Sequence, residues 1–285
     1  MNRQKSFQDP QKAALYLVPT PIGNVQELSE RALETLNQVD IIACEDTRNS
    51  GQLLKRLGIS KPLISHHEFN TASSIPGILK LLNEGKKIAI ISDAGYPLIS
   101  DPGSGLVQAL IEEDYPVIAL SGPNAALNAL VASGLSTQHF LYYGFLDAKS
   151  SKRKKQLENL KTFPYTLIFY EAPHRVEECL GDILEIFGDR KMTLARELTK
   201  LHEEYIRGTV QEILEICGEL KGEMVLVVEG ASQIPTHSLD DVVQKAMELA
   251  QAGVKPKKAA ELASEGTSFS KNAIYQEMLK RKDKI

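Results

Sequence analysis

The sequence predicts an α/β protein with two α/β domains followed by a small all-α segment, and three observations support this prediction. From residue 14 onward, short apolar runs alternate with amphipathic stretches, which is typical of strands joined by helical crossovers. A second series of such runs starts near residue 139, and only helical patterns follow residue 239. The chain has 285 residues, of which 42% are hydrophobic, so it is long enough to bury a core in each domain.

The first domain is expected over residues 13–125, with a parallel sheet. Its strands are predicted at residues 14–18, 39–44, 62–66, 87–92 and 116–120. Helices are predicted between them at residues 26–37, 47–57, 71–83 and 104–113. Gly58 and Gly85 stand where two of these helices should end, because glycine readily adopts the left-handed conformation that closes a helix.

The second domain is expected over residues 126–232, and its first strand begins near His139. Its strands are predicted at residues 139–145, 165–171, 191–197, 205–210 and 223–229, and its helices at residues 152–161, 174–187 and 210–220. A helical segment follows over residues 237–285, with helices at residues 239–252, 256–265 and 270–281. Ser270 is the expected N-cap of the last helix.

Composition excludes several classes of protein and site. No apolar run approaches the roughly 18 residues that a membrane-spanning helix needs, so we expect no membrane partner and a cytoplasmic location. Cys44, Cys179 and Cys217 are too far apart for a metal motif and odd in number, which favours three buried thiols over a disulfide framework. The adjacent His66 and His67 would point to opposite faces of an extended segment, so no metal site is predicted.

The basic residues are clustered, although the formal net charge is −4. One cluster comprises Lys149 and residues 152–155, and another lies at residues 280–284. A local basic face can bind phosphate groups, whereas a run of charge is also typical of a solvated helix surface. The sequence leaves both interpretations open.

Distinctive loops follow the strands of the first domain. They read PTPIGN (19–24), EDTRNS (45–50), HEFN (67–70), SDAGYP (92–97) and SGPNAA (121–126). Because the carboxyl ends of parallel strands share one edge of a sheet, we expect these loops to form a ligand site. Two Asp-x-Gly groups, at Asp93 and Asp101, come soon after the predicted fourth strand. No Walker A or GxGxxG motif is present, which disfavours nucleoside triphosphate and dinucleotide ligands.

Six segments show a resemblance to a known family, namely PTPIGN, EDTR, SDAGYPLISDPG, SGPNAA, EAPHR (171–175) and ARELTK (195–200). In order and spacing they resemble the RsmI subfamily of the tetrapyrrole-methylase-like (class III) methyltransferases. The resemblance covers about residues 14–230 and, less specifically, the C-terminal helices. It implies two α/β domains of the tetrapyrrole methylase type with the cofactor cleft between them, and a helix-turn-helix-like C-terminal segment. It also implies S-adenosylmethionine as the cofactor. The implied activity is methyl transfer to the ribose 2′-hydroxyl of a cytidine in the decoding region of small-subunit (16S) ribosomal RNA.

The resemblance also implies which residues contact the cofactor. They are Pro21, Asp93, Ala94, Gly95, Ser121, Gly122 and Pro123 in the first domain, and Glu171, Ala172, Val225 and Leu226 in the second. Backbone groups of glycine-rich loops can approach a ligand closely because no Cβ intervenes. We assign Asp93 to loop geometry or to polar groups of the cofactor, since a carboxylate against the sulfonium would stabilise the ground state more than the transition state.

Charged residues at the strand ends are the catalytic candidates. In an in-line displacement, alignment of the ribose oxygen with the methyl carbon supplies most of the acceleration, and a base can assist by removing the hydroxyl proton. The sequence does not choose among four candidate bases, Asp46, Glu68, Glu171 and Glu197. Phosphate or carboxylate clamps, with structural ion pairs as the alternative, are predicted at Arg48, Arg175 and Arg196.

The implied partner is small-subunit ribosomal RNA within an assembled 30S particle, and the implied oligomer is a homodimer. One alternative is a methylase for a small tetrapyrrole-like substrate. It is disfavoured because Asn24 stands where tetrapyrrole methylases have the acid of a GxGxGD motif. A non-catalytic RNA-binding assembly factor is the other alternative. The C-terminal helices are expected either to dock on the ribosomal particle or to pack as a helical cap.

Overall fold

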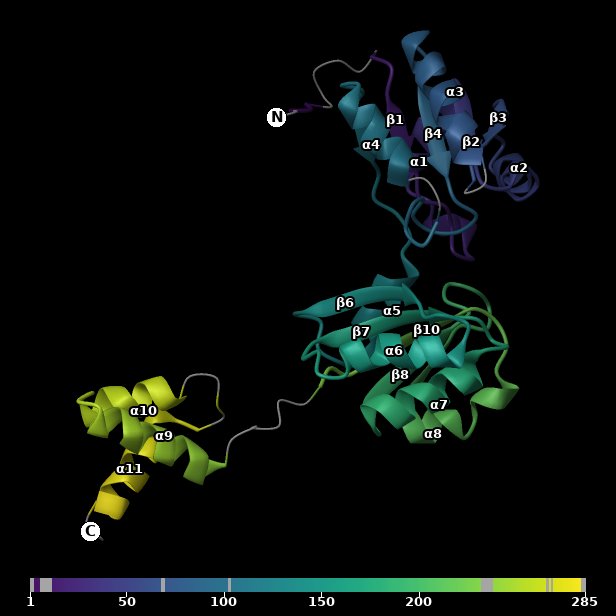
Figure 1. Cartoon of the computed structure of the whole chain (residues 1–285). Coiled ribbons are helices and arrows are strands. Elements are labelled where there is room, and N and C mark those ends of the chain that lie inside the picture. Colours follow the sequence, from purple (N-terminus) through teal and green to yellow (C-terminus); the bar gives the residue numbers. More distant parts are fainter. Residues whose placement is uncertain are drawn as a thin grey trace. The chain divides into compact units, whose positions relative to one another are not determined.

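The structure is a computed structural model that describes residues 3–5, 12–67, 70–101, 104–231, 238–264, 267 and 269–282. The chain divides into two compact units, Met1–Gly230 and Ala231–Ile285, and Figure 1 labels the elements of each. The first unit contains two five-stranded sheets, and the described part of the second unit contains helices only. The predicted α/β class with an all-α C-terminal segment is therefore confirmed.

All strands of the first sheet are parallel, as predicted. They are β1 Leu15–Leu17, β2 Ile41–Cys44, β3 Leu63–Ser65, β4 Ile88–Ile91 and β5 Val117–Ala119. Their spatial order is β3-β2-β4-β1-β5. Because β4 is the central strand, the residues that follow it lie in the middle of the edge where the carboxyl ends of the strands meet.

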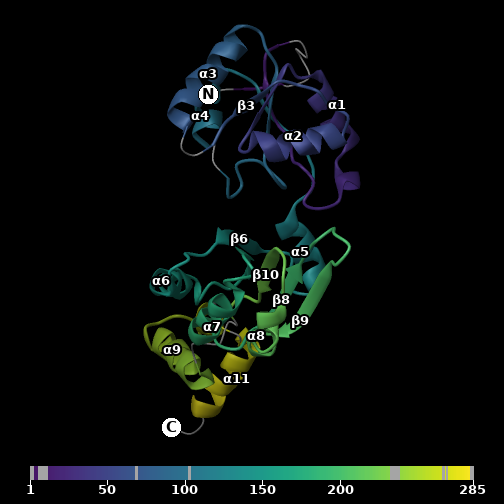
Figure 2. The ribbon, with the colours of Figure 1, turned by 90° about the vertical axis from the view of Figure 1, so that its right-hand side faces the viewer.

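Helices cover both faces of the first sheet. They are α1 Glu30–Gln38, α2 Thr47–Arg56, α3 Thr71–Asn83 and α4 Ser104–Glu112. One buried cluster joins Ala89 and Ile91 of β4 to α1 and α2, and another joins Ile88 and Ile90 to α3 and α4. Figure 2 shows these two pairs of helices on opposite sides of the sheet. The continuous apolar run of β4 therefore reflects a strand that is buried on both faces.

The predicted helix at residues 26–37 forms as two pieces, a 3-10 turn at Val25–Glu27 and α1. Ser29 lies between them in an extended conformation, and its hydroxyl accepts a hydrogen bond from the Ala32 amide at 3.2 Å. This N-cap starts a new helix, so apolar periodicity alone misplaces the boundary.

The second sheet is mixed, since β6 is parallel to β7 and all other neighbours are antiparallel. Its strands are β6 Phe140–Phe145, β7 Thr166–Glu171, β8 Lys191–Arg196, β9 Glu204–Thr209 and β10 Met224–Val228, in the order β6-β7-β10-β8-β9. One face packs against α6 Ser150–Leu160, α7 Val176–Phe187 and α8 Val210–Leu214. The predicted helix at residues 210–220 ends at Leu214, and a 3-10 turn at Cys217–Glu219 follows it.

Helix α5, Ala125–Ser133, covers the other face of the second sheet and is not predicted by the sequence patterns. Its apolar side chains point both ways, because Leu130 is buried whereas Leu127 and Val131 are 46% and 72% exposed. A helix without a polar face has no strong apolar periodicity, which explains the omission.

The second unit, called the helical unit below, consists of α9 Leu239–Gln251, α10 Pro256–Ser264 and α11 Lys271–Lys282. It has its own core, formed by Val242, Val243, Ala246, Ala259, Ala260, Ala263, Ile274 and Met278. The Ser270 hydroxyl accepts a hydrogen bond from the Ala273 amide at 3.2 Å, so the predicted N-cap of the last helix is confirmed.

The three cysteines are free and buried, as predicted. Within the described ranges, no helix is long and apolar enough to span a membrane. The His, Cys, Asp and Glu side chains described by the structure form no group of three or more that is placed to hold a metal ion.

Candidate functional site

A pocket of about 430 Å³ lies in the first unit and is lined by parts of both sheets. Its walls come from the residues after β4, from the start of α5, and from the point where Glu171 of β7 pairs with Met224 of β10. The lining includes six of the expected cofactor contacts, namely Asp93, Ala94, Gly95, Glu171, Ala172 and Val225. Such a volume is within the range of small-molecule sites, about 300–1,000 Å³.

Hydrogen bonds fix the loop that follows β4. The Gly95 and Thr20 backbones donate to each other's carbonyl oxygens, at 3.0 and 2.9 Å. The hydroxyl of Ser92 donates to the Gly95 carbonyl at 2.9 Å, and the hydroxyl of Thr20 donates to the Ser92 carbonyl at 3.0 Å. Gly95 has a φ of +75°, a conformation that L-residues with a Cβ rarely adopt. The glycine is thus required by the loop as well as by access to the pocket.

The other expected cofactor contacts do not belong to the lining of this pocket, namely Pro21, Ser121, Gly122, Pro123 and Leu226. Leu226 lies in the core beneath α6 and α7, because neighbouring residues of a strand face opposite sides and Val225 faces the other way. The Gly122 amide donates to the Tyr96 hydroxyl at 3.0 Å, and a Cβ on Gly122 would lie 2.7 Å from Cβ of Pro19. Gly122 therefore supports Tyr96, which does line the pocket.

Of the candidate bases that the structure describes, Glu171 alone lines the pocket, and Glu68 lies outside the described residues. The carboxylate of Asp46 caps α2 and accepts a hydrogen bond from the Arg48 amide at 2.7 Å. Glu197 forms an ion pair with Lys200 at 3.0 Å, and the hydrogen bond from Lys200 lowers the pKa of Glu197. The carboxylates of Asp46 and Glu197 thus contact neighbouring residues of the chain, and neither lines the pocket.

Glu171 is only 2% exposed. Its Oε1 accepts a hydrogen bond from the Ala172 amide at 2.8 Å and forms an ion pair with Nε of Arg175 at 3.2 Å. Its Oε2 has no hydrogen-bond partner within the described part of the chain. The Cys179 thiol has a strongly raised pKa, through burial first and then through the nearby Glu171 charge. A buried carboxylate oxygen without a partner beside a pocket is available to a ligand donor.

The candidate arginine clamps do not line the pocket. Arg175 pairs with Glu171 and donates to the Leu146 carbonyl at 2.8 Å. Arg196 forms an ion pair with Glu204 at 2.5 Å. Arg48 is exposed. Arg175 and Arg196 therefore form structural ion pairs, which are the predicted alternative to ligand clamps.

Asp101 lines the pocket but is not among the residues that the sequence selects as candidates. Burial raises the pKa of its carboxyl group to about 6, with further contributions from the negative charges of Glu45 and Asp93. The only signal in the sequence is the second Asp-x-Gly group, whose Pro102 and Gly103 lie outside the described residues. Sequence reasoning also misses other lining residues, among them Tyr96, Ser100, Asn124, Phe145 and Tyr170.

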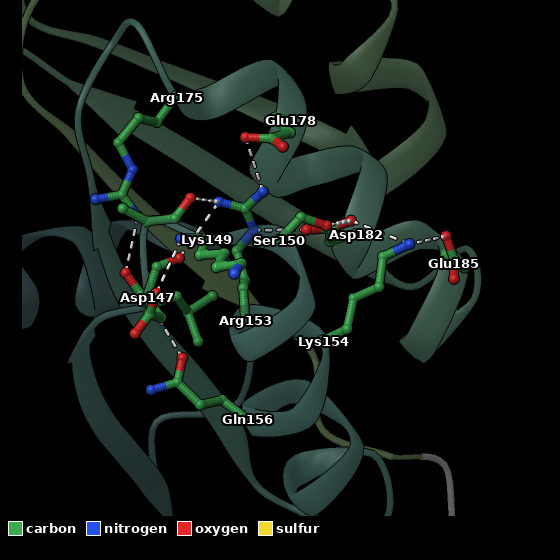
Figure 3. A network of polar contacts seen from close by, with 12 residues as sticks. Asp147, Lys149, Ser150, Arg153, Lys154, Gln156, Arg175, Glu178, Asp182 and Glu185 are labelled. Carbon is green, nitrogen blue, oxygen red and sulfur yellow. Dashed lines mark hydrogen bonds and ion pairs between the residues drawn. The ribbon is translucent and has the colours of Figure 1, made fainter.

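The basic run at residues 149–155 is not a uniform solvated face, because Arg153 is fully buried. Nε of Arg153 donates to Asp182 at 2.6 Å, and its second terminal nitrogen forms an ion pair with Glu178 at 3.0 Å. Figure 3 shows the Arg153 guanidinium between these two carboxylates of α7. Both the phosphate-binding and the solvated-surface interpretation are therefore wrong for Arg153, which joins α6 to α7.

Acidic side chains dominate the charge of the pocket. Asp93, Asp101, Glu171 and Glu223 line it, whereas no lysine or arginine of the described residues does. Ile22 and Leu198 add apolar wall. The pocket therefore suits a small molecule that combines positive charge and hydrogen-bond donors with an apolar part.

Two family models match the chain. The model of the tetrapyrrole (corrin/porphyrin) methylases matches residues 14–214, and the model described as the RsmI C-terminal HTH domain matches residues 237–282. Solved structures with a similar fold include the methyltransferase CobJ, with a TM-score of 0.58 and 18% identity over 77% of this chain and 95% of that one. Uroporphyrin-III-C-methyltransferase from Thermus thermophilus gives a TM-score of 0.56 and 22% identity over 76% and 94%.

Relatives named ribosomal RNA small subunit methyltransferase I match most of the chain. The protein of Streptococcus pyogenes serotype M18 is 44% identical over 97% of this chain and 99% of its own length. The Bacillus subtilis protein is 48% identical over 81% and 80%, and the Haemophilus influenzae protein is 44% identical over 92% and 95%.

Proposed function

This chain belongs to the tetrapyrrole (corrin/porphyrin) methylase family and, within it, to the ribosomal RNA small subunit methyltransferase I group, and from this premise we propose its reaction. It is an S-adenosylmethionine-dependent methyltransferase that methylates the ribose 2′-hydroxyl of a cytidine in the decoding region of 16S ribosomal RNA. The observation that supports this most is the acidic pocket after β4, which holds six of the expected cofactor contacts. The names of relatives at 44–48% identity support small-subunit ribosomal RNA as the substrate.

The pocket residues fit S-adenosylmethionine chemically. This cofactor carries a sulfonium, an ammonium group, ribose hydroxyls and an apolar purine face, and it supplies an electrophilic methyl group when bound. The backbone of residues 93–95 is fixed by the Thr20 and Ser92 hydrogen bonds, so its amides and carbonyls are preorganised to bind polar groups. Oε2 of Glu171 offers a buried acceptor. Four carboxylate side chains line the pocket, and their negative charge favours the binding of a cation.

We further propose that the protein acts in the cytoplasm as a homodimer on an assembled 30S particle. Exposed Leu127 and Val131 lie one turn apart on α5, and such apolar side chains are typical of a subunit interface. Exposed lysines of the helical unit, including Lys255 and Lys257, suit contact with a phosphate backbone.

A transfer assay tests the proposed reaction. The full chain, incubated with methyl-labelled S-adenosylmethionine and small subunits that carry unmethylated 16S ribosomal RNA, is expected to place label in the RNA. Alkaline hydrolysis should then leave the label in an alkali-resistant dinucleotide, because a methylated 2′-oxygen cannot attack the adjacent phosphate. Label in a base would contradict the 2′-hydroxyl assignment. Label that appears only in a small molecule would favour a tetrapyrrole substrate, and no label would favour a non-catalytic assembly factor.

A chain that ends at Ala231 is expected to bind S-adenosylmethionine like the full chain but to methylate assembled small subunits more slowly. The reason is that the helical unit has its own core and lies outside the unit that contains the pocket. Calorimetry measures cofactor affinity, sedimentation velocity measures the oligomer, and the labelled assay measures the rate on subunits. A full rate on assembled subunits would contradict docking by the helical unit. Loss of cofactor binding or of the dimer would instead identify the unit as a cap.

A further inference from the structure

Among the carboxylates that line the pocket, Asp101 is the one without a hydrogen-bond or ion-pair partner in the described part of the chain. Asp93 accepts a hydrogen bond from Asn49 at 2.9 Å, Glu171 pairs with Arg175 at 3.2 Å, and Glu223 pairs with Lys200 at 3.1 Å. Asp101 has no hydrogen bond or ion pair with another described residue, although it lines the same pocket. A carboxylate that is partly buried and unpaired is free to interact with a bound molecule.

Burial, together with the charges around it, makes Asp101 a stronger base than an ordinary aspartate. Burial raises its pKa to about 6, and Glu45 and Asp93 add to the effect. Glu171 and Glu223 line the same pocket, and no described lysine or arginine does so. Burial is the main cause of the raised pKa values of Tyr142 and Tyr170, and the Asp101 charge adds to both. At neutral pH the Asp101 carboxyl group is therefore mostly ionised and yet close to the basicity that suits proton transfer.

A network of hydroxyl groups holds the segment that carries Asp101. The hydroxyls of Ser100 and Tyr142 lie 2.7 Å apart. The ring centroids of Tyr142 and Tyr170 lie 5.1 Å apart, and the two rings are packed edge to face. The Tyr170 hydroxyl in turn accepts a hydrogen bond from the Ala126 amide of α5 at 3.2 Å. These contacts attach the loop after β4 to β6, β7 and α5.

The same segment has a constrained backbone. Leu98 and Ser100 have φ values of 74° and 61°, which are uncommon for residues with a Cβ. A Cβ on Gly144 of β6 would lie 3.1 Å from the Ser100 hydroxyl, so this glycine permits the close approach. Such strain persists only where surrounding contacts impose it, and here they hold Ser100, the residue directly before Asp101.

We propose that Asp101 is the general base that removes the proton from the substrate hydroxyl during methyl transfer. This inference rests on the proposed function. As the hydroxyl oxygen forms its bond to the methyl carbon, the carbon–sulfur bond breaks and its electron pair stays on sulfur. The hydroxyl proton passes to the Asp101 carboxylate, which later releases it to water. Charge balances, because one positive sulfonium and one negative carboxylate become two neutral groups.

The variant Asp101→Asn tests the proposal because asparagine keeps the size but cannot accept the proton. We expect the single-turnover rate on unmethylated small subunits to fall by about 10²–10⁴-fold, while calorimetry shows S-adenosylmethionine still bound. The wild-type rate should rise with pH to a plateau, with the midpoint of the rise near pH 6, and the rate of the variant should lack this rise. Carboxyl NMR of isotope-labelled aspartate in the free protein gives a readout independent of activity, since one signal that is lost in the variant should titrate near pH 6.

Glu45→Gln is the matched control, because Glu45 acts on Asp101 only through its charge and does not line the pocket. Removing that negative charge should move the midpoint of the pH–rate profile to lower pH and leave the plateau rate unchanged. A folded Asp101→Asn protein that methylates at the full rate, or an Asp101 signal that titrates near pH 4, overturns the proposal. Wild-type protein that places no methyl group on RNA overturns the proposed function itself, which is a different result.

Discussion

Replacing Arg153 by methionine is expected to lower the free energy of unfolding of the first unit by about 3 kcal/mol, because it leaves a buried carboxylate without its main partner. Asp182 is 6% exposed and accepts the hydrogen bond of Arg153 at 2.6 Å. Lys154, 3.5 Å from Asp182, remains to compensate in part. The guanidinium also donates to the backbone carbonyls of Asp147 and Ala148, which precede α6, and Figure 3 shows how these contacts converge.

Urea unfolding followed by circular dichroism measures this loss. The matched control is Lys155→Met, because Lys155 is an exposed neighbour on the same helix, and it should change stability by less than about 0.5 kcal/mol. The double variant Arg153→Met, Asp182→Leu should recover much of the loss, since an apolar pair can replace a buried ion pair. Equal effects of the two single variants would show that Arg153 belongs to a solvated surface after all.

Gly95→Val is expected to weaken S-adenosylmethionine binding by more than about tenfold while the chain stays folded. A residue with a Cβ costs about 1–2 kcal/mol in the left-handed conformation, a β-branched one costs more, and about 1.4 kcal/mol corresponds to tenfold in affinity. A Cβ alone would fit, because it would lie 3.5 Å from Ile22 and 3.9 Å from the Pro123 carbonyl. The backbone conformation at φ +75° is therefore the main cause, and relieving it moves residues 93–95 out of the pocket wall.

Gly58→Val is the matched control for this effect. Gly58 has a φ of +71°, and a Cβ at this position would have no atom within 4 Å. It follows α2 and is not part of the lining of the pocket. Calorimetry should show unchanged cofactor affinity for Gly58→Val and reduced affinity for Gly95→Val, with similar losses of stability. Equal cofactor affinities in the two folded variants would remove the loop after β4 from the binding site.

The sequence predicts the ligand edge of the first sheet because that inference depends on local pattern and one topological rule. Apolar runs identify the strands, and parallel strands bring the residues that follow them to one edge, so Asp93 and Gly95 are located in advance. It is harder to predict which face of the sheet the side chain of a given strand residue lies on. Leu226 was expected at the pocket beside Val225, but a strand turns adjacent side chains to opposite faces.

The roles of Arg153 and Asp101 could not be predicted, because they depend on residues that are distant in the sequence. In the sequence, Arg153 is one residue of a basic run, but its role depends on Asp182, which lies 29 residues away on another helix. Asp101 gains its raised pKa from burial and from Glu45, which follows a different strand. Helix α5 lacks the polar face that would mark it as a helix. Long-range packing therefore decides the roles of Arg153 and Asp101, and the periodicity of a single sequence contains no information about it.

The three buried cysteines lie in the cores of two different sheets, so the opening of each sheet can be observed separately. Cys44 lies in the core between the first sheet and α1 and α2, whereas Cys179 and Cys217 lie in the core of the second sheet. Burial raises the pKa of all three thiols, so an alkylating reagent reaches them only when the surrounding structure opens. Mass-resolved alkylation kinetics of the unmodified protein therefore report the opening frequency of each sheet on its own, with no engineered probe.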